Sequence, residues 1–280
     1  MPGRFTGRRA LVTGSSRGIG AATAERLAAE GADVAITART KEHHERLAGS
    51  LDETAERIGR HGGKVATVVA DLTDEADRAR IVPEASSALG GPIDILVNNA
   101  AAAMYAPVAE FPTKRRRILF EANVFAPADL AAAVMPAMIE RGDGWIVNVS
   151  SGAARHWDGP PFDLGPQGSS IAMYGASKAA LNRVSNGLAA ELEGTGIRVN
   201  TVEPRAAVMS EGAAALVGAT IRPDQIESLE EMVEAIVALC GCPPHVSGRT
   251  FVSLDLLAAW DLEVRGLDGL ALPGVGESSQ

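Results

Sequence analysis

Short apolar runs alternate with longer amphipathic stretches along most of the chain, and this alternation restricts the fold more than any other feature. The apolar runs are continuous, as expected for strands buried on both faces of a parallel sheet. The predicted strands are Ala10–Thr13, Asp33–Ala38, Lys64–Val69, Ile93–Asn98, Trp145–Ser150, Arg198–Glu203 and Thr250–Ser253. The predicted helices are Gly18–Glu30, Glu42–Arg60, Asp74–Leu89, Thr113–Arg141, Tyr174–Leu192 and Ser228–Cys240. Because such alternation forms right-handed βαβ units, we expect an α/β, doubly wound Rossmann fold with a central parallel seven-stranded sheet and helices on both faces.

Charge, cysteines and hydropathy exclude several classes of function. The formal net charge of −9 disfavours nucleic acid as a partner, and the basic run 114–117 is expected to be a solvated helix face. Cys240 and Cys242 form neither a disulfide framework nor a metal-ligand set, so we expect reduced structural thiols and no metal site. No leader precedes the first strand, and no apolar run approaches the roughly 18 residues of a membrane span. We therefore expect no membrane contact and a cytoplasmic location.

A glycine-rich turn follows the first predicted strand and opens a helix. It reads Thr13-Gly14-Ser15-Ser16-Arg17-Gly18-Ile19-Gly20. Glycines let the backbone turn tightly and approach a pyrophosphate, whose charge is stabilised by the amides and the positive dipole end of the helix. Because the motif lies in the required strand–turn–helix context, it predicts a phosphate-binding turn.

With this turn, over about residues 8–254, the chain resembles the short-chain dehydrogenase/reductase family, whose fingerprint is TGxxxGxG. The resemblance implies that Asp71, with Leu72, meets the adenine ring, and that Asn98-Asn99-Ala100 corresponds to the family's NNAG motif. Ala101 stands where the family usually has glycine, so its backbone must avoid positive φ or carry strain. The cofactor-binding residues so implied are Gly14, Ser16, Arg17, Gly18, Ile19, Gly20, Arg39, Asp71, Leu72, Asn99, Ala100, Tyr174, Lys178, Pro204 and Val208.

Two arginines favour one dinucleotide over the other. The second strand ends Thr37-Ala38-Arg39, where NAD-binding proteins generally place an acid that accepts hydrogen bonds from the ribose. Arg39 instead offers a fork suited to a 2′-phosphate, and Arg17 is a second cation within reach. The same two basic positions mark NADP preference in the family that the chain resembles. We expect NADP(H) as the preferred cofactor, with NAD(H) possible.

Tyr174 and Lys178 lie four residues apart at the start of a helix, which puts both on one helix face. A phenol with a pKa near 10 is a poor proton shuttle at neutral pH, and a nearby ammonium brings that pKa toward the working range. Ser151 follows the fifth strand and can donate a hydrogen bond to a substrate oxygen. The resemblance favours Ser151, but Ser150 stays open because a shift of one residue moves the hydroxyl to the other face.

Asn123 lies inside the predicted helix Thr113–Arg141, where asparagine is unfavourable, so it is expected to have a buried polar role. In the family this asparagine holds a water that links the lysine to solvent. A turn without chemistry is the alternative. The predicted catalytic set is Asn123, Ser151, Tyr174 and Lys178.

These residues predict an oxidoreductase that uses NADP(H) and moves a hydride between the nicotinamide and a ketone or secondary alcohol, with Tyr174 as acid and base. The alternatives are an NAD-dependent alcohol dehydrogenase of the same fold and a catalytically silent protein that senses NADP by binding it. The expected partners are a small carbonyl or alcohol substrate and further copies of the chain. The alanine-rich fourth and fifth predicted helices are suited to packing across a two-fold axis, which gives a homodimer or homotetramer.

The chain departs from the family pattern on the substrate side. Arg205 replaces the glycine of the usual Pro-Gly after the sixth strand, and it either contacts an anionic substrate or turns outward. We expect one Rossmann-type dinucleotide-binding and catalytic domain over 1–280, with substrate-side loops at 152–173 and 205–222 and an atypical C-terminal tail at 255–280. Trp157 and Phe162 in the first loop are suited to roofing a pocket, and Gly212–Ala219 in the second to acting as a lid.

Overall fold

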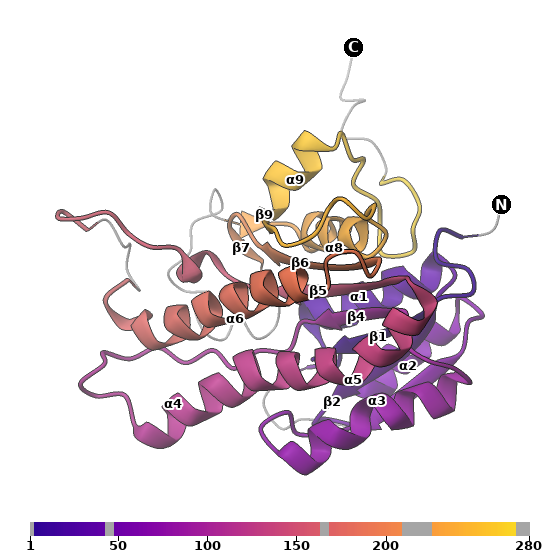
Figure 1. Cartoon of the computed structure of the whole chain (residues 1–280), viewed down its shortest axis with the longest axis horizontal. Coiled ribbons are helices and arrows are strands. Elements are labelled where there is room, and N and C mark those ends of the chain that lie inside the picture. Colours follow the sequence, from indigo (N-terminus) through magenta and orange to yellow (C-terminus); the bar gives the residue numbers. More distant parts are fainter. Residues whose placement is uncertain (1–2, 43–47, 163–167, 209–225, 273–280) are drawn as a thin grey trace.

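The fold is an α/β, doubly wound Rossmann fold around a seven-stranded parallel sheet, as predicted. The computed structural model describes residues 3–42, 48–162, 168–208 and 226–272. The strands are ordered β3-β2-β1-β4-β5-β6-β9 (Figure 1). All run parallel, but the chain adds β2 and β3 on one side of β1 and then crosses back to add β4 and the later strands on the other side. Their bounds are β1 Arg9–Thr13, β2 Asp33–Ala38, β3 Val65–Val69, β4 Ile95–Asn98, β5 Gly144–Val149, β6 Ile197–Glu203 and β9 Thr250–Val252. Ligands bind at the carboxyl ends of strands near such a reversal.

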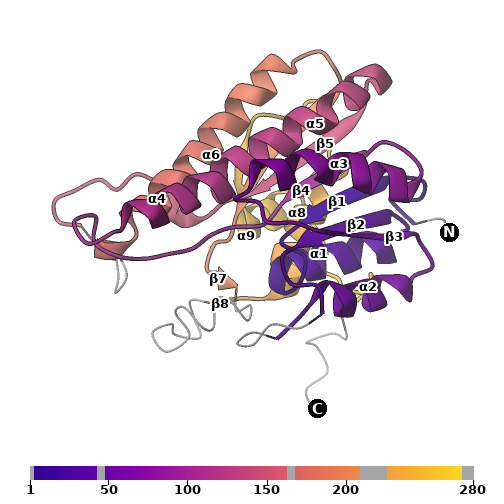
Figure 2. The same ribbon diagram turned by 90° about the horizontal axis from the view of Figure 1, so that it is seen from below.

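Helices cover both faces of the sheet, and each face has its own apolar core. Figure 2 shows α3, α5 and α6 on one side of the strands and α1 and α2 on the other. Successive strand residues point to opposite faces, so Leu11 joins the core under α3 and α5, while Val12 joins the core under α1 and α8. The helix bounds are α1 Gly18–Ala29, α2 Leu51–Gly59, α3 Glu75–Leu89, α4 Thr113–Phe120, α5 Ala126–Arg141, α6 Ala172–Glu191, α8 Leu229–Leu239 and α9 Ser253–Ala259. β7 (Ala207–Val208) and β8 (Ile226–Glu227) form a separate two-stranded parallel sheet.

The helix predicted at Glu42–Arg60 is wrong over the described residues 48–50. It begins only at Leu51, because Ser50 is extended and its side chain caps the helix by accepting a hydrogen bond of 3.1 Å from the Glu53 amide. Gly49 has a φ of 93°, which a helix cannot contain. The first part of the predicted helix includes residues 43–47, which lie outside the described residues.

The long helix Thr113–Arg141 is continuous but irregular. The segment η1, Glu121–Phe125, forms a π-helical turn between α4 and α5. The expectation that no apolar segment reaches the length of a membrane span is wrong here, since this helix is long and apolar enough to cross a membrane. Half of its most apolar window is buried inside the fold, and α5 packs against α3 and β5. It is therefore built like a core helix. The basic run that opens it, 114–117, is largely exposed, as predicted.

The last strand is shorter than predicted. Ser253, expected as a strand residue, begins α9, which no periodicity suggested. The Ser253 hydroxyl donates a hydrogen bond of 2.7 Å to the buried Glu227, a contact between distant segments that a local sequence pattern does not show. Leu256 and Leu257 then bury one face of α9 in the core beside α8.

Candidate active site

The glycine-rich turn is packed so closely that side chains do not fit at two of its positions. Gly14 has a φ of 65°, and a Cβ there would lie 2.7 Å from the Ala100 Cα. A Cβ on Gly20 would lie 2.4 Å from the Gly14 carbonyl oxygen and 2.3 Å from the Asn99 amide nitrogen. The Asn99 side chain donates to the Thr13 carbonyl at 2.9 Å, and the Ala100 amide donates to the Thr13 hydroxyl at 3.0 Å. The ends of β1 and β4 are thereby locked together around the turn.

The start of α1 presents an open set of amide donors. Arg17 is the N-cap residue, its side chain makes no capping hydrogen bond, and the first turn has no acidic residue. Helix N-termini in this state attract anions through their amides and dipole. Gly18 has a φ of 54° and carries no Cβ, while Ser16 is buried and Ile19 packs on the core. The turn fits the pyrophosphate of a dinucleotide.

Arg17 and Arg39 differ in how firmly they are held. Arg17 donates to the Gly49 carbonyl at 2.9 Å. Arg39, at the end of β2, is three-quarters exposed and forms an ion pair of 3.8 Å with Asp71 after β3. Asp71 also accepts hydrogen bonds from the Thr73 amide and hydroxyl, and the adjacent Leu72 is half-buried. The two arginines predicted to bind a 2′-phosphate thus lie after β1 and after β2, and Arg39 already forms an ion pair with a carboxylate.

Tyr174 lies in the first turn of α6, is only 8% exposed, and has a hydrogen bond to Ser151. Burial raises the pKa of Tyr174 to about 12, the nearby Tyr105 adds to the rise, and the Ser151 hydrogen bond opposes it. We expected Lys178 to lower this pKa, but in the protein alone it does not contribute to the shift. Instead, the Lys178 ammonium group donates to the Val149 carbonyl at 2.8 Å.

Lys178 is buried one helical turn after Tyr174, with 2% of the residue exposed. Burial lowers the pKa of Lys178 to about 8, because the charged form loses its hydration. This residue therefore changes protonation state near physiological pH.

The two serines after β5 point to different surroundings. Ser151 is the one beside Tyr174, and its hydroxyl also accepts from the Ala153 amide at 3.2 Å. The Ser150 hydroxyl is buried and has no hydrogen-bond partner among the described residues. The geometry thus brings Ser151, not Ser150, to the phenol.

Asn123 lies in the π-helical turn and is fully buried. Its amide pairs with the backbone of Ala102 on both sides, at 2.8 Å and 2.9 Å, and donates to the Ser177 hydroxyl at 3.0 Å. Ser177 in turn donates to the Tyr174 carbonyl at 2.7 Å. These contacts connect Asn123 to the first turn of α6 and to the loop after β4.

Tyr105 is a site residue that the sequence analysis missed. Its ring meets that of Tyr174 edge to face, with centroids 5.5 Å apart and planes at 64°. Tyr105 belongs to a small apolar cluster with Phe111, Leu119 and Tyr174. Its place in the sequence could have indicated this, because the loop after Asn99 leaves the carboxyl end of β4, which lies beside the carboxyl end of β5.

The segment after β6 is held by acids. Val208 is buried in β7, and Pro204 is half-buried at the end of β6. The Arg205 amide donates to the Glu227 carboxylate at 2.8 Å, and its guanidinium forms an ion pair with Asp255 of α9. Of the two expectations for Arg205, the outward turn toward α9 matches the structure. The predicted lid, Gly212–Ala219, lies outside the described residues.

Two further sequence expectations are settled by backbone and exposure. Ala101 avoids positive φ, since Asp261 is the one non-glycine residue with positive φ in the part of the chain that the structure describes. Cys240 and Cys242 are free, buried thiols, as expected. Trp157 and Phe162 are 41% and 59% exposed, so the aromatic residues suggested as a pocket roof lie largely in solvent.

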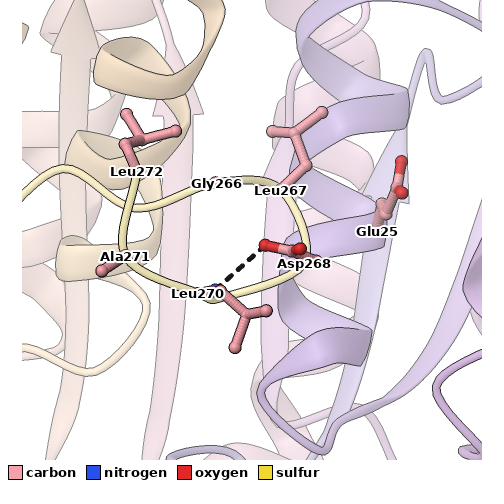
Figure 3. Close-up of a pocket in the computed structure, with 7 residues that line it drawn as sticks. All are labelled: Glu25, Gly266, Leu267, Asp268, Leu270, Ala271 and Leu272. Carbon is pink, nitrogen blue, oxygen red and sulfur yellow. Dashed lines mark hydrogen bonds between the residues drawn. The ribbon is translucent and has the colours of Figure 1, made fainter. Parts of the chain in front are cut away.

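A cavity of about 400 Å³ lies away from these residues. It is lined by Glu25 of α1 and by the C-terminal loop 266–272, which is closed by a hydrogen bond from the Leu270 amide to Asp268 (Figure 3). None of the predicted site residues lines it. The candidate active site is instead the edge at the carboxyl ends of β1, β4, β5 and β6, which are neighbours in the sheet.

Comparison with known proteins gives a consistent result. The family model for short chain dehydrogenases matches residues 8–216. The chain is 31% identical over 261 residues to hydroxysteroid dehydrogenase-like protein 2 of Rattus norvegicus, covering 91% of this chain and 47% of the relative. It is also 38% identical over 204 residues to a short chain dehydrogenase of Pseudocercospora fijiensis, covering 72% of this chain and 60% of that relative. The chain thus spans about half the length of the first relative and 60% of the second.

Solved structures agree over nearly the whole chain. A short chain dehydrogenase of Mycobacterium thermoresistibile has a TM-score of 0.79 at 28% identity, covering 98% of this chain and 96% of that one. A 3-oxoacyl (acyl-carrier-protein) reductase of Agrobacterium tumefaciens with NADP bound has a TM-score of 0.74 at 28% identity, covering 89% and 93%. The chain therefore belongs to the short-chain dehydrogenase family, a family of nicotinamide-dependent oxidoreductases.

Proposed function

We propose that this protein is an NADP(H)-dependent oxidoreductase that interconverts a ketone and a secondary alcohol. The observation that carries the proposal is the convergence of Ser151, Tyr174 and Lys178 at the carboxyl end of β5, on the edge that holds the open glycine-rich turn. When bound at that turn, the dinucleotide supplies or takes up the hydride.

The residues of the chain handle the proton and the substrate oxygen. Ser151 donates a hydrogen bond to that oxygen, and Tyr174 gives it a proton in reduction or removes one in oxidation. The pKa of Tyr174, about 12 in the protein alone, must fall for this task. Lys178 is the group on the same helix face that can lower it when charged. Asn123, through Ser177, holds the turn that carries Tyr174.

The cofactor preference is the finer part of the proposal. Arg17 and Arg39 are suited to the 2′-phosphate of NADP. The Asp71 carboxylate beside Arg39 weakens that preference, so NAD remains the alternative cofactor. A relative of the same fold, the reductase of Agrobacterium tumefaciens, was solved with NADP bound.

The decisive experiment compares Tyr174→Phe with Tyr105→Phe. NADPH oxidation is followed by the loss of its absorbance with a panel of aliphatic and aromatic ketones. Tyr174→Phe is expected to lower kcat by at least about 100-fold, the usual contribution of a general acid. Tyr105→Phe keeps its ring on Tyr174 and is expected to stay within roughly threefold of the wild type. Tight NADPH binding without any turnover would favour the silent NADP sensor instead.

Assembly and location belong to the same proposal. We propose a homodimer or homotetramer, supported by Phe125, Ile139 and Val184, which are between 38% and 49% exposed on η1, α5 and α6. Light scattering of the wild type and of Phe125→Glu tests it, with a monomeric wild type as the contrary result. We propose a cytoplasmic location without membrane contact, supported by the two free cysteines. Cell fractionation tests it.

A further inference from the structure

An arginine and a buried glutamate meet one strand away from the catalytic serine. Glu203 is the last residue of β6, directly after Val202, which pairs with Val149 of β5. Arg155 follows the short helix η2, Gly152–Ala154, that begins just after Ser151. This helix presses on α6, since a Cβ on Gly175 would lie 2.4 Å from the Ala153 carbonyl oxygen. The pair therefore lies on the strand-end edge beside Ser151.

The glutamate is held in an energetically demanding position. Glu203 is 3% exposed, and one carboxylate oxygen accepts a hydrogen bond of 2.5 Å from the Arg155 Nε. The other oxygen is buried and has no hydrogen-bond partner in the described part of the chain. Burying a carboxylate without full hydrogen bonding is energetically unfavourable. Its effect on the fold is to fix the direction of one guanidinium group.

That guanidinium keeps its other donors available. The Arg155 side chain is 51% exposed, and neither of its Nη groups has a hydrogen bond to the residues that the structure describes. The two Nη groups of an arginine match the two oxygens of a carboxylate in a bidentate contact. Arg205, by contrast, directs its Nη2 to Asp255 on α9. Two arginines on one edge thus differ in whether their forks are occupied.

We infer that Arg155, oriented by Glu203, is the subsite for a carboxylate on the substrate. The inference rests on the proposed function and makes it narrower: the carbonyl substrate carries an anionic carboxylate near the ketone, as a keto acid does. Because Glu203 already neutralises part of the arginine charge, recognition depends on the two directed Nη hydrogen bonds. The expected preference over a neutral analogue is therefore moderate, about tenfold.

The test uses acetoacetate and its methyl ester, which differ at one group, a charged carboxylate in the first and a neutral methyl ester in the second. With the wild-type protein and NADPH, kcat/KM is expected to be about tenfold higher for acetoacetate. Arg155→Gln is expected to remove this preference through KM while leaving the ester within roughly twofold of the wild type. Arg155→Lys keeps the charge without the fork and is expected to restore little of it. Arg205→Gln is the matched control and should change neither substrate.

A second measurement needs no turnover. The shift in melting temperature caused by 3-hydroxybutyrate, relative to its methyl ester, is expected to vanish in Arg155→Gln and in Glu203→Gln but to persist in Arg205→Gln. A preference that survives in Arg155→Gln overturns the inference, and one that survives in Glu203→Gln overturns the role of the glutamate. If the wild type reduces neither these two ketones nor any of the ketone panel but the melting shift behaves as described, the proposed function fails and the carboxylate subsite stands.

Discussion

The candidate active site runs along the carboxyl ends of the strands, and its two ends are stabilised by different interactions. At β1 and β4 the chain is held by glycine contacts and neutral amides, such as the Asn99 side chain on the Thr13 carbonyl at 2.9 Å. At β6 and β9 it is held by carboxylates, with Glu203 and Glu227 only 3% and 1% exposed. Each of these two acids has one buried oxygen without a partner among the described residues. The first end depends on shape and the second on charge.

The difference separates positions where side chains can be substituted without moving the backbone from positions where they cannot. Close backbone packing at Gly14 and Gly20 suits a ligand part that is the same in every reaction, the dinucleotide. Charges placed on a rigid strand end can be exchanged without moving the backbone, which suits recognition of one particular substrate. The family pattern is kept at the first end except at Ala101. It is broken at the second, where Glu203 and Arg205 flank Pro204.

The largest effect is expected from adding one methyl group at the first end. In Gly20→Ala the new Cβ meets the Gly14 carbonyl oxygen, a backbone atom, at 2.4 Å, so the turn must open. We expect a loss of unfolding free energy of about 3 kcal/mol and a Kd for NADPH at least about tenfold higher. Urea unfolding and a fluorescence titration measure the two changes.

The matched control for this variant is Gly59→Ala in α2, where a Cβ meets nothing within 4 Å. It is expected to leave the protein as stable as the wild type or more stable by roughly 0.5–1 kcal/mol. Equal losses in the two variants would contradict the role assigned to close packing at the turn.

The next effect is a pH dependence that comes from Lys178. Its pKa is about 8 in the folded protein, against 10.5 in the unfolded chain. Between these pH values the unfolded state holds a proton that the folded state has lost, so the unfolding free energy rises with pH. The rise reaches about 1.4 kcal/mol per pH unit and about 3 kcal/mol in total. Below pH 8 the protein carries the whole cost of the buried ammonium.

Urea unfolding of the wild type and of Lys178→Met between pH 7 and pH 10 isolates this contribution, because other titrating groups are common to both proteins. The unfolding free energy of the wild type minus that of Lys178→Met is expected to increase from pH 8 upward. Above pH 10 the raised pKa of Tyr174, about 12, acts in the opposite direction, so the comparison stops there. Parallel curves would show that Lys178 is not held as a desolvated amine.

Sequence patterns predicted the sheet, the glycine turn and the shared helix face of Tyr174 and Lys178 because these depend on short-range rules, whereas Ser151 was favoured by the family resemblance. Continuous apolar runs predict buried parallel strands, and a spacing of four predicts one helix face for Tyr174 and Lys178. What sequence could not predict is set by contacts between distant segments. α9 depends on Ser253 meeting Glu227, and the ring contact of Tyr105 depends on how the loop after β4 folds onto α6. The direction of the Tyr174 pKa shift likewise follows from burial, which no local pattern reports.

A smaller effect is expected at Arg39, in the choice of cofactor. Arg39→Asp places a second carboxylate beside Asp71, where Arg39 now forms an ion pair of 3.8 Å. The KM for NADPH is expected to rise at least about tenfold and that for NADH less than about threefold, since only NADPH carries the 2′-phosphate. Arg60→Asp, another exposed arginine with a carboxylate partner, should change neither value. An equal rise for both cofactors would remove Arg39 from the phosphate site.

The smallest effect is expected at Arg205, and it decides whether the exposed charges of the second end hold the fold. Arg205 and Asp255 are 47% and 60% exposed, and exposed pairs contribute about 0–1 kcal/mol. Arg26 is the buried counterpart, 1% exposed and paired with Glu30 at 2.7 Å and Glu234 at 2.8 Å. Arg26→Gln is expected to cost about 3 kcal/mol because it leaves two acids without their cation, whereas Arg205→Gln costs less than about 1. Thermal and urea unfolding compare them. Similar losses would mean that the outward-facing ion pair is part of the scaffold, and the second end would then be no more exchangeable than the first.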